Sequence, residues 1–306
     1  MRIVVVGAGA MGSLYGGRLK ESGQDVVLVD IWAEHVAAIN RGGLKIQNEK
    51  DVRVIPISAC LPHDAGGKAD LIIVFTKTFH TEEALNSVKQ LVYDQTLVLT
   101  LQNGLGNVEL LNKFFSPDKI ILGTTNFPSD LIGPGHIKSL GAGETKIMAF
   151  GNCEVNRLEK IRKALDAAGF KCSVEKDIFP LIWEKVAFNA AMNSLTSVTK
   201  LTVGRLGSSP EGRDLTFQVA DEVLTVAEIK GLSVNRERVR KMIMEAFVEH
   251  YDHMPSMLQD TLAGKKTEID SINGAVVKEA SEAGTAVPAT EVLYKIIKVL
   301  EKNRTP

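Results

Sequence analysis

The start of the chain constrains its fold more than any other segment. Residues 2–6 (RIVVV) form a continuous run rich in β-branched side chains, the pattern of a strand buried on both faces of a parallel sheet. A Gly-x-Gly-x-x-Gly motif follows at once and opens a helix-compatible stretch that reaches Ser22. Residues 26–30 (VVLVD) read as a second strand and complete a βαβ unit. This order predicts a dinucleotide-binding domain at the beginning of the chain.

Each glycine of the motif has a task in such a site. Gly7 permits the tight turn, Gly9 lets the backbone approach a pyrophosphate, and Gly12 lets the helix pack close to the strand. The helix N-terminus then offers unpaired N–H groups and the positive end of its dipole to the phosphates. The plain alternative is a tight strand-to-helix turn without a ligand. The predicted cofactor-binding residues of this loop are Gly7, Ala8, Gly9, Ala10, Met11 and Gly12.

An acidic residue ends the second predicted strand. Asp30 stands 18 residues after Gly12, where a carboxylate can accept hydrogen bonds from the hydroxyls of the adenosine ribose. The same charge repels a 2′-phosphate, and no Arg or Lys lies between Asp30 and Arg41. The sequence therefore favours NAD(H) as cofactor and leaves NADP(H) open, while a solvated aspartate at a strand end is the alternative without function.

Strand-like and helix-like segments continue to alternate as far as about residue 175. Strands are predicted at 71–75, 96–101 and 119–123 and helices at 34–40, 81–92, 106–114 and 154–168, with antiparallel hairpins at the sheet's edge over 124–151. Beyond Pro180 the periodicity is helical throughout, over 181–198, 211–231, 235–250 and 271–301. We predict an α/β protein in which an N-terminal Rossmann-type doubly wound sheet, residues 1–176, precedes an all-helical C-terminal domain, residues 177–306.

Composition restricts the partners of the chain. A length of 306 residues suits two domains, and 36 Lys and Arg against 37 Asp and Glu leave a formal net charge of −1. This balance gives no electrostatic reason to expect nucleic acid or a membrane surface as partner. The three cysteines, Cys60, Cys153 and Cys172, are widely spaced and form no CxxC pair, and we find no metal-ligand motif. A cytoplasmic protein that acts on a small molecule is expected.

The predicted helix 181–198 carries an unusual line of polar side chains. Lys185, Asn189 and Asn193 are four residues apart in turn, which keeps them within roughly 80° of one another on one helical face. Their neighbours are apolar, so the helix is expected to be largely buried, where unpartnered polar groups are costly. A substrate-binding cleft explains the line economically, and a polar ladder between helices is the alternative.

Two polar segments follow directly on buried strands of the first domain. Thr76-Lys77-Thr78 comes after strand 71–75, and Gln102-Asn103-Gly104 comes after strand 96–101. Open α/β sheets bind ligands at the carboxyl ends of their parallel strands. We therefore expect Lys77 and Asn103 to lie near the ligand, although either segment could be an ordinary polar turn.

Taken together, the motifs identify a family. The chain resembles the ketopantoate reductases over essentially its whole length, through GAGAMG at 7–12, TKT at 76–78, QNG at 102–104, the WEKxxxNxxxNxxT pattern at 183–196 and SMLQD…TEIDxING at 256–274. The resemblance implies a Rossmann domain joined to a helical domain, a fold class similar to that of 6-phosphogluconate dehydrogenase. It further implies reduction of 2-dehydropantoate to (R)-pantoate with a nicotinamide cofactor, a step in pantothenate and coenzyme A biosynthesis.

The resemblance also assigns roles to residues that match the family's motifs. Lys185 matches the catalytic lysine, and Glu268 matches a glutamate near it and near the cofactor. Lys77 and Asn103 match residues that line the nicotinamide. A lysine ammonium beside the carbonyl would stabilise the alkoxide formed by hydride transfer and protonate it. The implied substrate-binding residues are Asn103, Lys185, Asn189, Asn193 and Ser256.

Three positions depart from the family's pattern. His253 and Val203 stand where amide side chains are usual, and Asp30 stands near the place of a basic residue that binds NADPH. These departures keep a second hypothesis open, that of an NAD-dependent D-2-hydroxyacid dehydrogenase acting on other branched 2-oxo acids. A non-catalytic dinucleotide sensor is a third, against which Lys185 and Glu268 argue. Pairing of the long C-terminal helices would give a homodimer, which the sequence leaves undecided.

Overall fold

The computed structural model describes residues 1–303, which fold into two compact units. Unit 1 comprises Met1–Gln102 and Asn107–Ile178, and unit 2 comprises Asn103–Gly106 together with the chain from Phe179 onward. The four residues Asn103–Gly106 thus interrupt the sequence of unit 1 and pack with unit 2. Each unit has its own cluster of buried apolar side chains.

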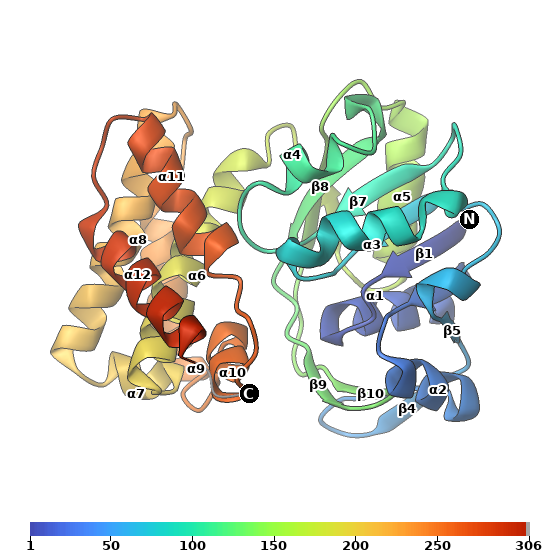
Figure 1. Ribbon diagram of the computed structural model, residues 1–306, viewed down its shortest axis with the longest axis horizontal. Coiled ribbons are helices and arrows are strands. Elements are labelled where there is room, and N and C mark those ends of the chain that lie inside the picture. Colours follow the sequence, from blue (N-terminus) through green and yellow to red (C-terminus); the bar gives the residue numbers. More distant parts are fainter. Residues whose placement is uncertain (304–306) are drawn as a thin grey trace. The chain divides into compact units, whose positions relative to one another are not determined.

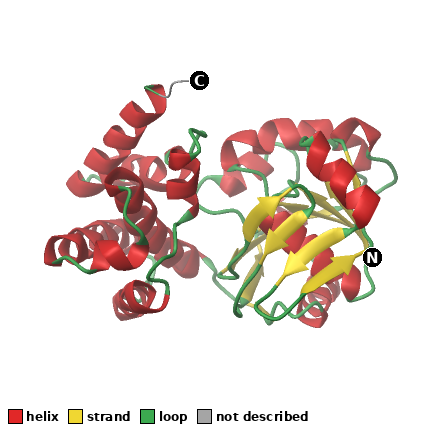
Figure 2. Ribbon diagram, turned by 90° about the horizontal axis from the view of Figure 1, so that it is seen from below, coloured by secondary structure: helices red, strands yellow, loops and turns green. Residues whose placement is uncertain are grey.

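An eight-stranded sheet forms the centre of unit 1, and helices cover both of its faces (Figures 1 and 2). Its strand order is β12-β11-β8-β7-β6-β1-β2-β5. The six strands from β8 to β5 are parallel, β11 runs antiparallel to β8, and β12 is parallel to β11. The bounds are β1 (Arg2–Val6), β2 (Asp25–Val29), β5 (Ser58–Cys60), β6 (Leu71–Val74), β7 (Leu97–Thr100), β8 (Ile120–Thr125), β11 (Thr145–Ala149) and β12 (Cys172–Val174).

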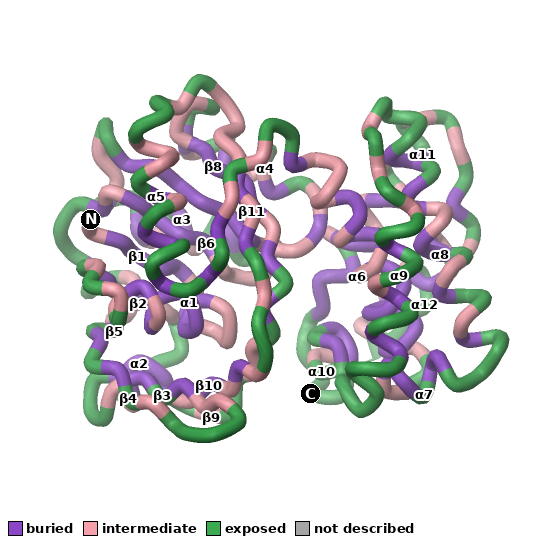
Figure 3. Tube along the Cα trace, turned by 180° about the vertical axis from the view of Figure 1, so that it is seen from behind, coloured by how far each residue is buried: buried purple, intermediate pink, exposed green. Residues whose placement is uncertain are grey.

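Burial on both faces explains the composition of the central strands. Every residue of β6 and β7 is buried, as are the last four residues of β1, and Figure 3 shows β1 and β6 largely in purple. Only apolar side chains can fill both faces of such a strand, which is why the strands read as continuous apolar runs. The helices of this unit are α1 (Ala10–Glu21), α2 (Ala33–Gly42), α3 (Thr81–Ser87), α4 (Asn107–Leu111) and α5 (Val155–Ala167).

Two helices of unit 1 are shorter than predicted. The helix expected over 81–92 ends at Ser87, because Val88 leaves the helical region (φ −118°, ψ 13°), and a 3-10 turn follows at Lys89–Leu91. The helix expected over 106–114 ends at Leu111, where the Phe114 N–H bonds the Leu111 carbonyl in a tighter turn. Further 3-10 turns span Pro62–Asp64, Thr78–His80 and Pro117–Lys119.

A second sheet lies on the other side of α1, and the prediction for 124–151 was partly wrong about it. The strand β11 does join the edge of the large sheet, as expected, but β9 (Asp130–Gly133) and β10 (His136–Lys138) leave it. They form a hairpin, and β10 pairs with β3 (Leu44–Gln47), which pairs in turn with β4 (Val52–Ile55), in the order β4-β3-β10-β9. Helix α1 fits between the two sheets because Gly16 faces Leu28 of the large sheet and Gly17 faces Ile46 of the small one.

Unit 2 is all-helical and is built around α6 (Phe179–Thr199) (Figure 1). The buried carboxylate of Glu184 on α6 accepts two hydrogen bonds of 2.6 Å from Arg238 and one from the Asn235 N–H, which ties α6 to α9. No helix among residues 1–303 is long and apolar enough to cross a membrane. The other helices are α7 (Val203–Gly207), α8 (Pro210–Ile229), α9 (Arg236–Glu249), α10 (Ser256–Leu262), a π-helix (Asp270–Gly274), α11 (Ala275–Glu282) and α12 (Pro288–Lys302).

The predicted fold class, a Rossmann-type sheet followed by helices, is confirmed. The helical stretch 271–301 is divided into the π-helix, α11 and α12. Gly284, at φ +69°, and Pro288, at the first position of α12, separate the last two helices.

Candidate active site

The glycine loop leaves room for a ligand at the start of α1. A Cβ at Gly7 (φ +90°) would lie 2.7 Å from the Thr76 nitrogen, and one at Gly12 would lie 1.9 Å from the Gly7 oxygen. A Cβ at Gly9, in contrast, would meet nothing within 4 Å, so Gly9 borders open space. Its backbone caps α1 without a side-chain hydrogen bond, and the first turn of α1 contains no acidic residue. These features fit the pyrophosphate of a dinucleotide.

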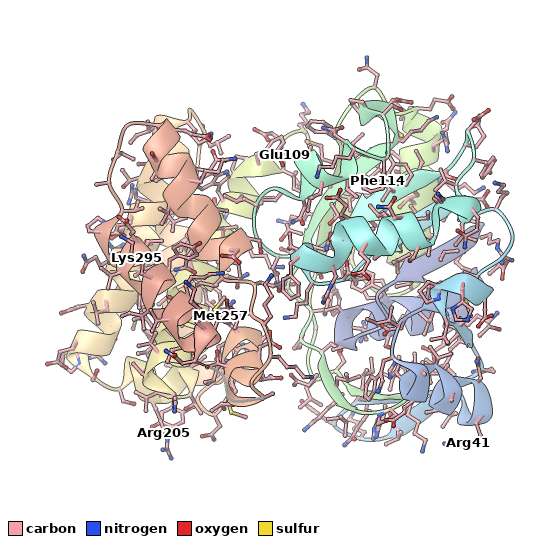
Figure 4. The ribbon with its side chains drawn as sticks, in the orientation of Figure 1. Arg41, Glu109, Phe114, Arg205, Met257 and Lys295 are labelled. Atoms are coloured by element: carbon pink, nitrogen blue, oxygen red, sulfur yellow. The ribbon has the colours of Figure 1, made fainter. Side chains whose placement is uncertain are left out.

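Asp30 directly follows β2 and holds the glycine loop in place. One carboxylate oxygen accepts the Ala8 N–H at 2.7 Å, and the other accepts the Trp32 N–H at 2.9 Å. Each oxygen can accept a second hydrogen bond, so the carboxylate can still bind a ribose hydroxyl. Arg41 lies in the last turn of α2, at the other end of a ten-residue helix about 15 Å long, and its side chain is exposed (Figure 4).

A hollow opens beside Asp30, with a volume of about 480 Å³. Its lining comes from the residues that follow β2 and β5, from the 3-10 turn Pro62–Asp64 and from α3, and most of it is apolar. A flat aromatic ring, such as a nucleobase, fits such a surface better than a charged group does. The lining residues are Ile31, Leu61, Pro62, His63 and Ser87.

The segments after β6 and β7 are tied together at their starts. The Gln102 side-chain amide donates to the Thr76 carbonyl at 2.6 Å and to the Thr81 hydroxyl at 2.8 Å. Lys77 follows Thr76 as a half-buried residue and begins the 3-10 turn Thr78–His80. Lys77 therefore lies at the carboxyl edge of the sheet in unit 1, as the sequence predicted.

Asn103 belongs to unit 2 because the next two residues dock on the π-helix. The Leu105 N–H donates to the Ser271 carbonyl at 2.8 Å. Gly104 has φ +83°, and a Cβ there would lie 2.4 Å from the same carbonyl oxygen. On the other side of the π-helix, the Asn273 amide donates to the Ala190 carbonyl of α6 at 3.2 Å. A π-helix widens one turn and changes its carbonyl pattern, a feature that is frequent at functional sites.

Lys185 and Glu268 form the charged centre of unit 2. Lys185 is half-buried on α6, and Glu268, 7% exposed, immediately precedes the π-helix region. Loss of hydration lowers the pKa of Lys185 to about 8, and the negative charge of Glu268 opposes this effect. A lysine in this state can donate a proton near neutral pH and remains charged enough to stabilise an oxyanion.

The segment that carries Glu268 is anchored by residues the sequence did not single out. Both the N–H and the hydroxyl of Thr267 donate to the Glu301 carboxylate, at 2.8 and 2.7 Å. In the sequence, Thr267 is only part of the family motif at 256–274. No local signal pairs it with Glu301, which follows it by 34 residues on α12.

The predicted substrate residues also lie in unit 2. Asn189 and Asn193 follow Lys185 by one and two turns of the same continuous helix, and Asn193 is 5% exposed. Ser256 is exposed at the first position of α10, a helix that packs against α6. Two of the three departures from the family pattern are neighbours, because the Val203 N–H donates to the His253 carbonyl at 3.1 Å. Val203 is buried and apolar, whereas His253 is exposed.

Residues 1–303 contain no group of three or more His, Cys, Asp or Glu side chains placed to hold a metal ion. The polar groups gathered in unit 2 are a lysine, a glutamate and amides, and the candidate ligand-binding features of unit 1 are backbone N–H groups and one aspartate.

Comparison with known proteins matches both halves of the chain. The model of the ketopantoate reductase PanE/ApbA family matches residues 3–152, and the model of its C-terminal part matches residues 177–301. A 2-dehydropantoate 2-reductase of Streptococcus pyogenes serotype M3 is 30% identical over 305 residues, 98% of each chain. One from Halobacterium salinarum is 31% identical over 304 residues, 99% of this chain and 100% of the relative.

Solved structures share the whole architecture. A D-mandelate dehydrogenase in a ternary structure with NADH and anilino(oxo)acetate has a TM-score of 0.94 and 30% identity, with 99% of each chain covered. The 2-dehydropantoate 2-reductase of Geobacter metallireducens has a TM-score of 0.90 and 29% identity over 100% of each chain. The chain therefore belongs to the ketopantoate reductase family of nicotinamide-dependent oxidoreductases.

Proposed function

We propose that this protein reduces 2-dehydropantoate to (R)-pantoate by hydride transfer from a nicotinamide cofactor, in pantothenate and coenzyme A biosynthesis. The observation that carries the proposal is Lys185 on α6, the helix that also bears Asn189 and Asn193. Burial lowers the pKa of Lys185 to about 8, although the charge of Glu268 opposes this shift. A proton donor poised near neutral pH, next to amides that can bind a carboxylate and a hydroxyl, suits the reduction of a 2-oxo acid. The proposal includes a cytoplasmic location and a homodimeric state. Light scattering, which gives the molar mass in solution, would test the homodimeric state.

The cofactor-binding part of the proposal rests on unit 1. When bound, a reduced nicotinamide supplies the hydride. The loop Gly7–Gly12 and the first turn of α1 would hold the pyrophosphate, and the hollow lined by Ile31 and Leu61 would take the adenine. Asp30 would accept the ribose hydroxyls and repel a 2′-phosphate, while the next Arg or Lys in the sequence, Arg41, lies at the far end of α2. We therefore propose NAD(H) as the preferred cofactor, with Lys77 and Asn103 beside the nicotinamide.

The chemical step follows from Lys185. As a hydride reaches the carbonyl carbon, a C–H bond forms, the C=O π bond breaks and negative charge develops on oxygen. The Lys185 ammonium stabilises this charge and transfers a proton to the oxygen, which gives the alcohol and a neutral amine. Solvent then returns a proton to the amine. Glu268 holds the ammonium form by its charge, because it raises the pKa that burial lowers.

Substrate orientation would come from amides and hydroxyls around the lysine. Asn189 and Asn193 project from the same face of α6, and Ser256 opens α10. An amide can donate to a carboxylate and accept from a hydroxyl, so these groups can distinguish the two ends of a hydroxylated 2-oxo acid.

A second candidate function is a D-2-hydroxyacid dehydrogenase that uses NADH. Two observations favour it: the likeness to a D-mandelate dehydrogenase that was solved with NADH, and the adjacent pair Val203 and His253. A buried valine in place of an amide binds a hydroxyl less firmly and an apolar substituent more firmly. The lysine chemistry would be the same, whereas the preferred substituent on the 2-oxo acid would differ.

One assay separates these proposals. Purified protein is given NADH or NADPH with 2-dehydropantoate and with a panel of branched and aromatic 2-oxo acids, and kcat/KM is measured for each pair. A clear preference for 2-dehydropantoate supports the first proposal, and a preference for another 2-oxo acid supports the second. Binding of a dinucleotide without turnover of any substrate would contradict both and indicate a sensor.

A further inference from the structure

A buried histidine in unit 1 has no part in the proposed chemistry. His35, on α2, is 1% exposed, and both of its ring nitrogens have partners. The backbone N–H of Gly135 donates to Nδ1 at 3.0 Å, and Nε2 lies 3.3 Å from the Ser13 hydroxyl. Because the Gly135 N–H can only donate, Nδ1 is the bare nitrogen and Nε2 carries the hydrogen. The imidazole is therefore neutral and donates to Ser13.

The hydrogen bonds continue from Ser13 to the glycine loop. The Ser13 hydroxyl donates its hydrogen to the Ala8 carbonyl at 2.6 Å, so it accepts a hydrogen bond from His35. The Ala8 N–H is held in turn by Asp30 at 2.7 Å. Both polar groups of the Ala8 backbone are thus fixed by side chains. The next residue is Gly9, whose surroundings are open for a ligand, so the orientation of Ala8 sets the position of the N–H groups that follow it.

The other end of this series of hydrogen bonds is anchored in the small sheet. Gly135 lies in the turn between β9 and β10 with φ +69°, and its carbonyl accepts the Lys45 N–H of β3 at 2.8 Å. A Cβ at Gly135 would lie 3.0 Å from the Ala38 methyl group on α2. The turn is therefore held against α2, and His35 connects it through Ser13 to the loop at the start of α1.

We propose that His35 is a positioning residue for cofactor binding: its neutral imidazole, through Ser13, holds the Ala8–Gly9 backbone in the shape that receives the pyrophosphate. The inference rests on the proposed cofactor site, but it concerns binding alone and not the reduction. Removal of a link between His35 and Ala8 weakens the binding of the cofactor and leaves the rate of the chemical step unchanged once the cofactor is saturating.

The electrostatic surroundings give this arrangement a pH dependence. Burial lowers the pKa of His35 below its ordinary value of 6.5, and both the negative charge of Asp30 and a hydrogen bond to the Ala8 backbone oppose this shift. The other named neighbours are uncharged: the Ser13 hydroxyl on α1, the Gly135 backbone and the Trp32 ring, which stacks at 5.3 Å between centroids. A protonated ring would turn Nδ1 into a donor facing the Gly135 N–H. Acidification therefore breaks the anchor, and cofactor affinity falls as the pH falls.

The test measures NADH binding directly, from the fluorescence of bound NADH in titrations of the full-length protein without substrate. Ser13→Ala removes the relay to Ala8, and His35→Asn keeps an acceptor near the Nδ1 position but cannot reach Ser13. Each is expected to raise the Kd for NADH about three- to tenfold, the worth of one hydrogen bond, and to change kcat at saturating NADH less than twofold. The double variant should match His35→Asn, because both substitutions act on the same contacts between His35 and the Ala8 backbone.

Two controls separate positioning from general damage. Thr216→Val removes a buried hydroxyl on α8, which donates to the Gly212 carbonyl of its own helix at 2.7 Å, and should leave the Kd for NADH unchanged. In the unaltered protein the Kd should rise as the pH falls below 6.5, and this rise should be smaller in His35→Asn. Unchanged Kd values in Ser13→Ala and His35→Asn, or the same acid response in His35→Asn, would overturn the inference. Failure of the unaltered protein to bind NADH would instead contradict the proposed function.

Discussion

Lys185 has a pKa lowered to about 8, because its charge is poorly hydrated. If it is the proton donor, reduction requires the ammonium form, which is lost as the pH rises through the pKa. We expect kcat for reduction to fall above about pH 8 and kcat for the reverse oxidation to rise over the same range. Glu268→Gln removes the charge that raises this pKa, so both profiles should shift to lower pH. Steady-state pH profiles of the two proteins measure this, and profiles with the same midpoint would exclude the coupling.

Removal of the lysine itself makes a sharper distinction between chemistry and binding. Lys185→Ala should lower kcat about 100- to 10,000-fold, the range of general acid catalysis, and leave the Kd for NADH unchanged, because the proposed cofactor residues of the glycine loop lie in unit 1. Lys278→Ala, at a side chain that is 74% exposed and paired with Glu282, is the matched control and should retain full activity. Comparable turnover in the two variants would remove Lys185 from the mechanism.

Asp30 has a structural task as well as the proposed reading of the ribose. Since its carboxylate accepts the N–H groups of Ala8 and Trp32, Asp30→Ala loosens the loop for either cofactor. It also removes the charge that repels a 2′-phosphate. We expect kcat/KM for NADH to fall about tenfold or more and that for NADPH to fall less or to rise, so that the ratio of the two shifts toward NADPH. An equal loss for both cofactors would mean that the carboxylate only supports the loop.

The helices, strands and turns that depend on neighbouring residues could be predicted from the sequence. The apolar run of β1, the glycine loop and the line of Lys185, Asn189 and Asn193 on α6 all follow from periodicity and turn chemistry. The pairing of the β9–β10 hairpin with β3 did not, because short strands carry no mark of their partners and the space for the small sheet is created by Gly17 of α1. The π-helix and the anchor of Thr267 on Glu301 likewise depend on contacts distant in sequence.

The docking of Asn103–Gly106 on the π-helix also depends on residues distant in sequence, and a substitution can test whether it positions Asn103. A methyl group at Gly104 would lie 2.4 Å from the Ser271 oxygen on a residue with φ +83°, so Gly104→Ala must move the segment off the π-helix and displace Asn103. Gly106 has φ +86° but nothing within 4 Å of its Cβ position, which makes Gly106→Ala a control for backbone strain alone. We expect both variants to lose about 1 kcal/mol of stability to strain and only Gly104→Ala to lose kcat by tenfold or more. Equal kcat in the two would show that docking does not position Asn103.

The whole molecule consists of two units with separate apolar cores, one around the large sheet and one around α6. The proposed roles are divided in the same way: the glycine loop, Asp30 and His35 belong to unit 1, whereas Lys185, Glu268 and Asn103 belong to unit 2. A ligand that binds only the folded protein stabilises it by mass action, by about 2.7 kcal/mol at a concentration of 100 times its Kd. The protection against hydrogen exchange that such a ligand confers is greatest where it makes contact.

NADH alone should therefore slow amide exchange most in β1, in the first turns of α1 and at the end of β2, with a smaller effect in α8 and α9. The same pattern is expected in Lys185→Ala, because the lysine is not part of the proposed cofactor site, and it should weaken in Ser13→Ala at an equal NADH concentration. Hydrogen exchange measured by mass spectrometry, with and without NADH, resolves these segments. Protection centred on α8 and α9 would place the dinucleotide in unit 2, against both the proposed cofactor site and the role of His35. Loss of all protection in Lys185→Ala would instead make that lysine a cofactor-binding residue, since a proton donor to the substrate has no reason to alter NADH binding in the substrate's absence.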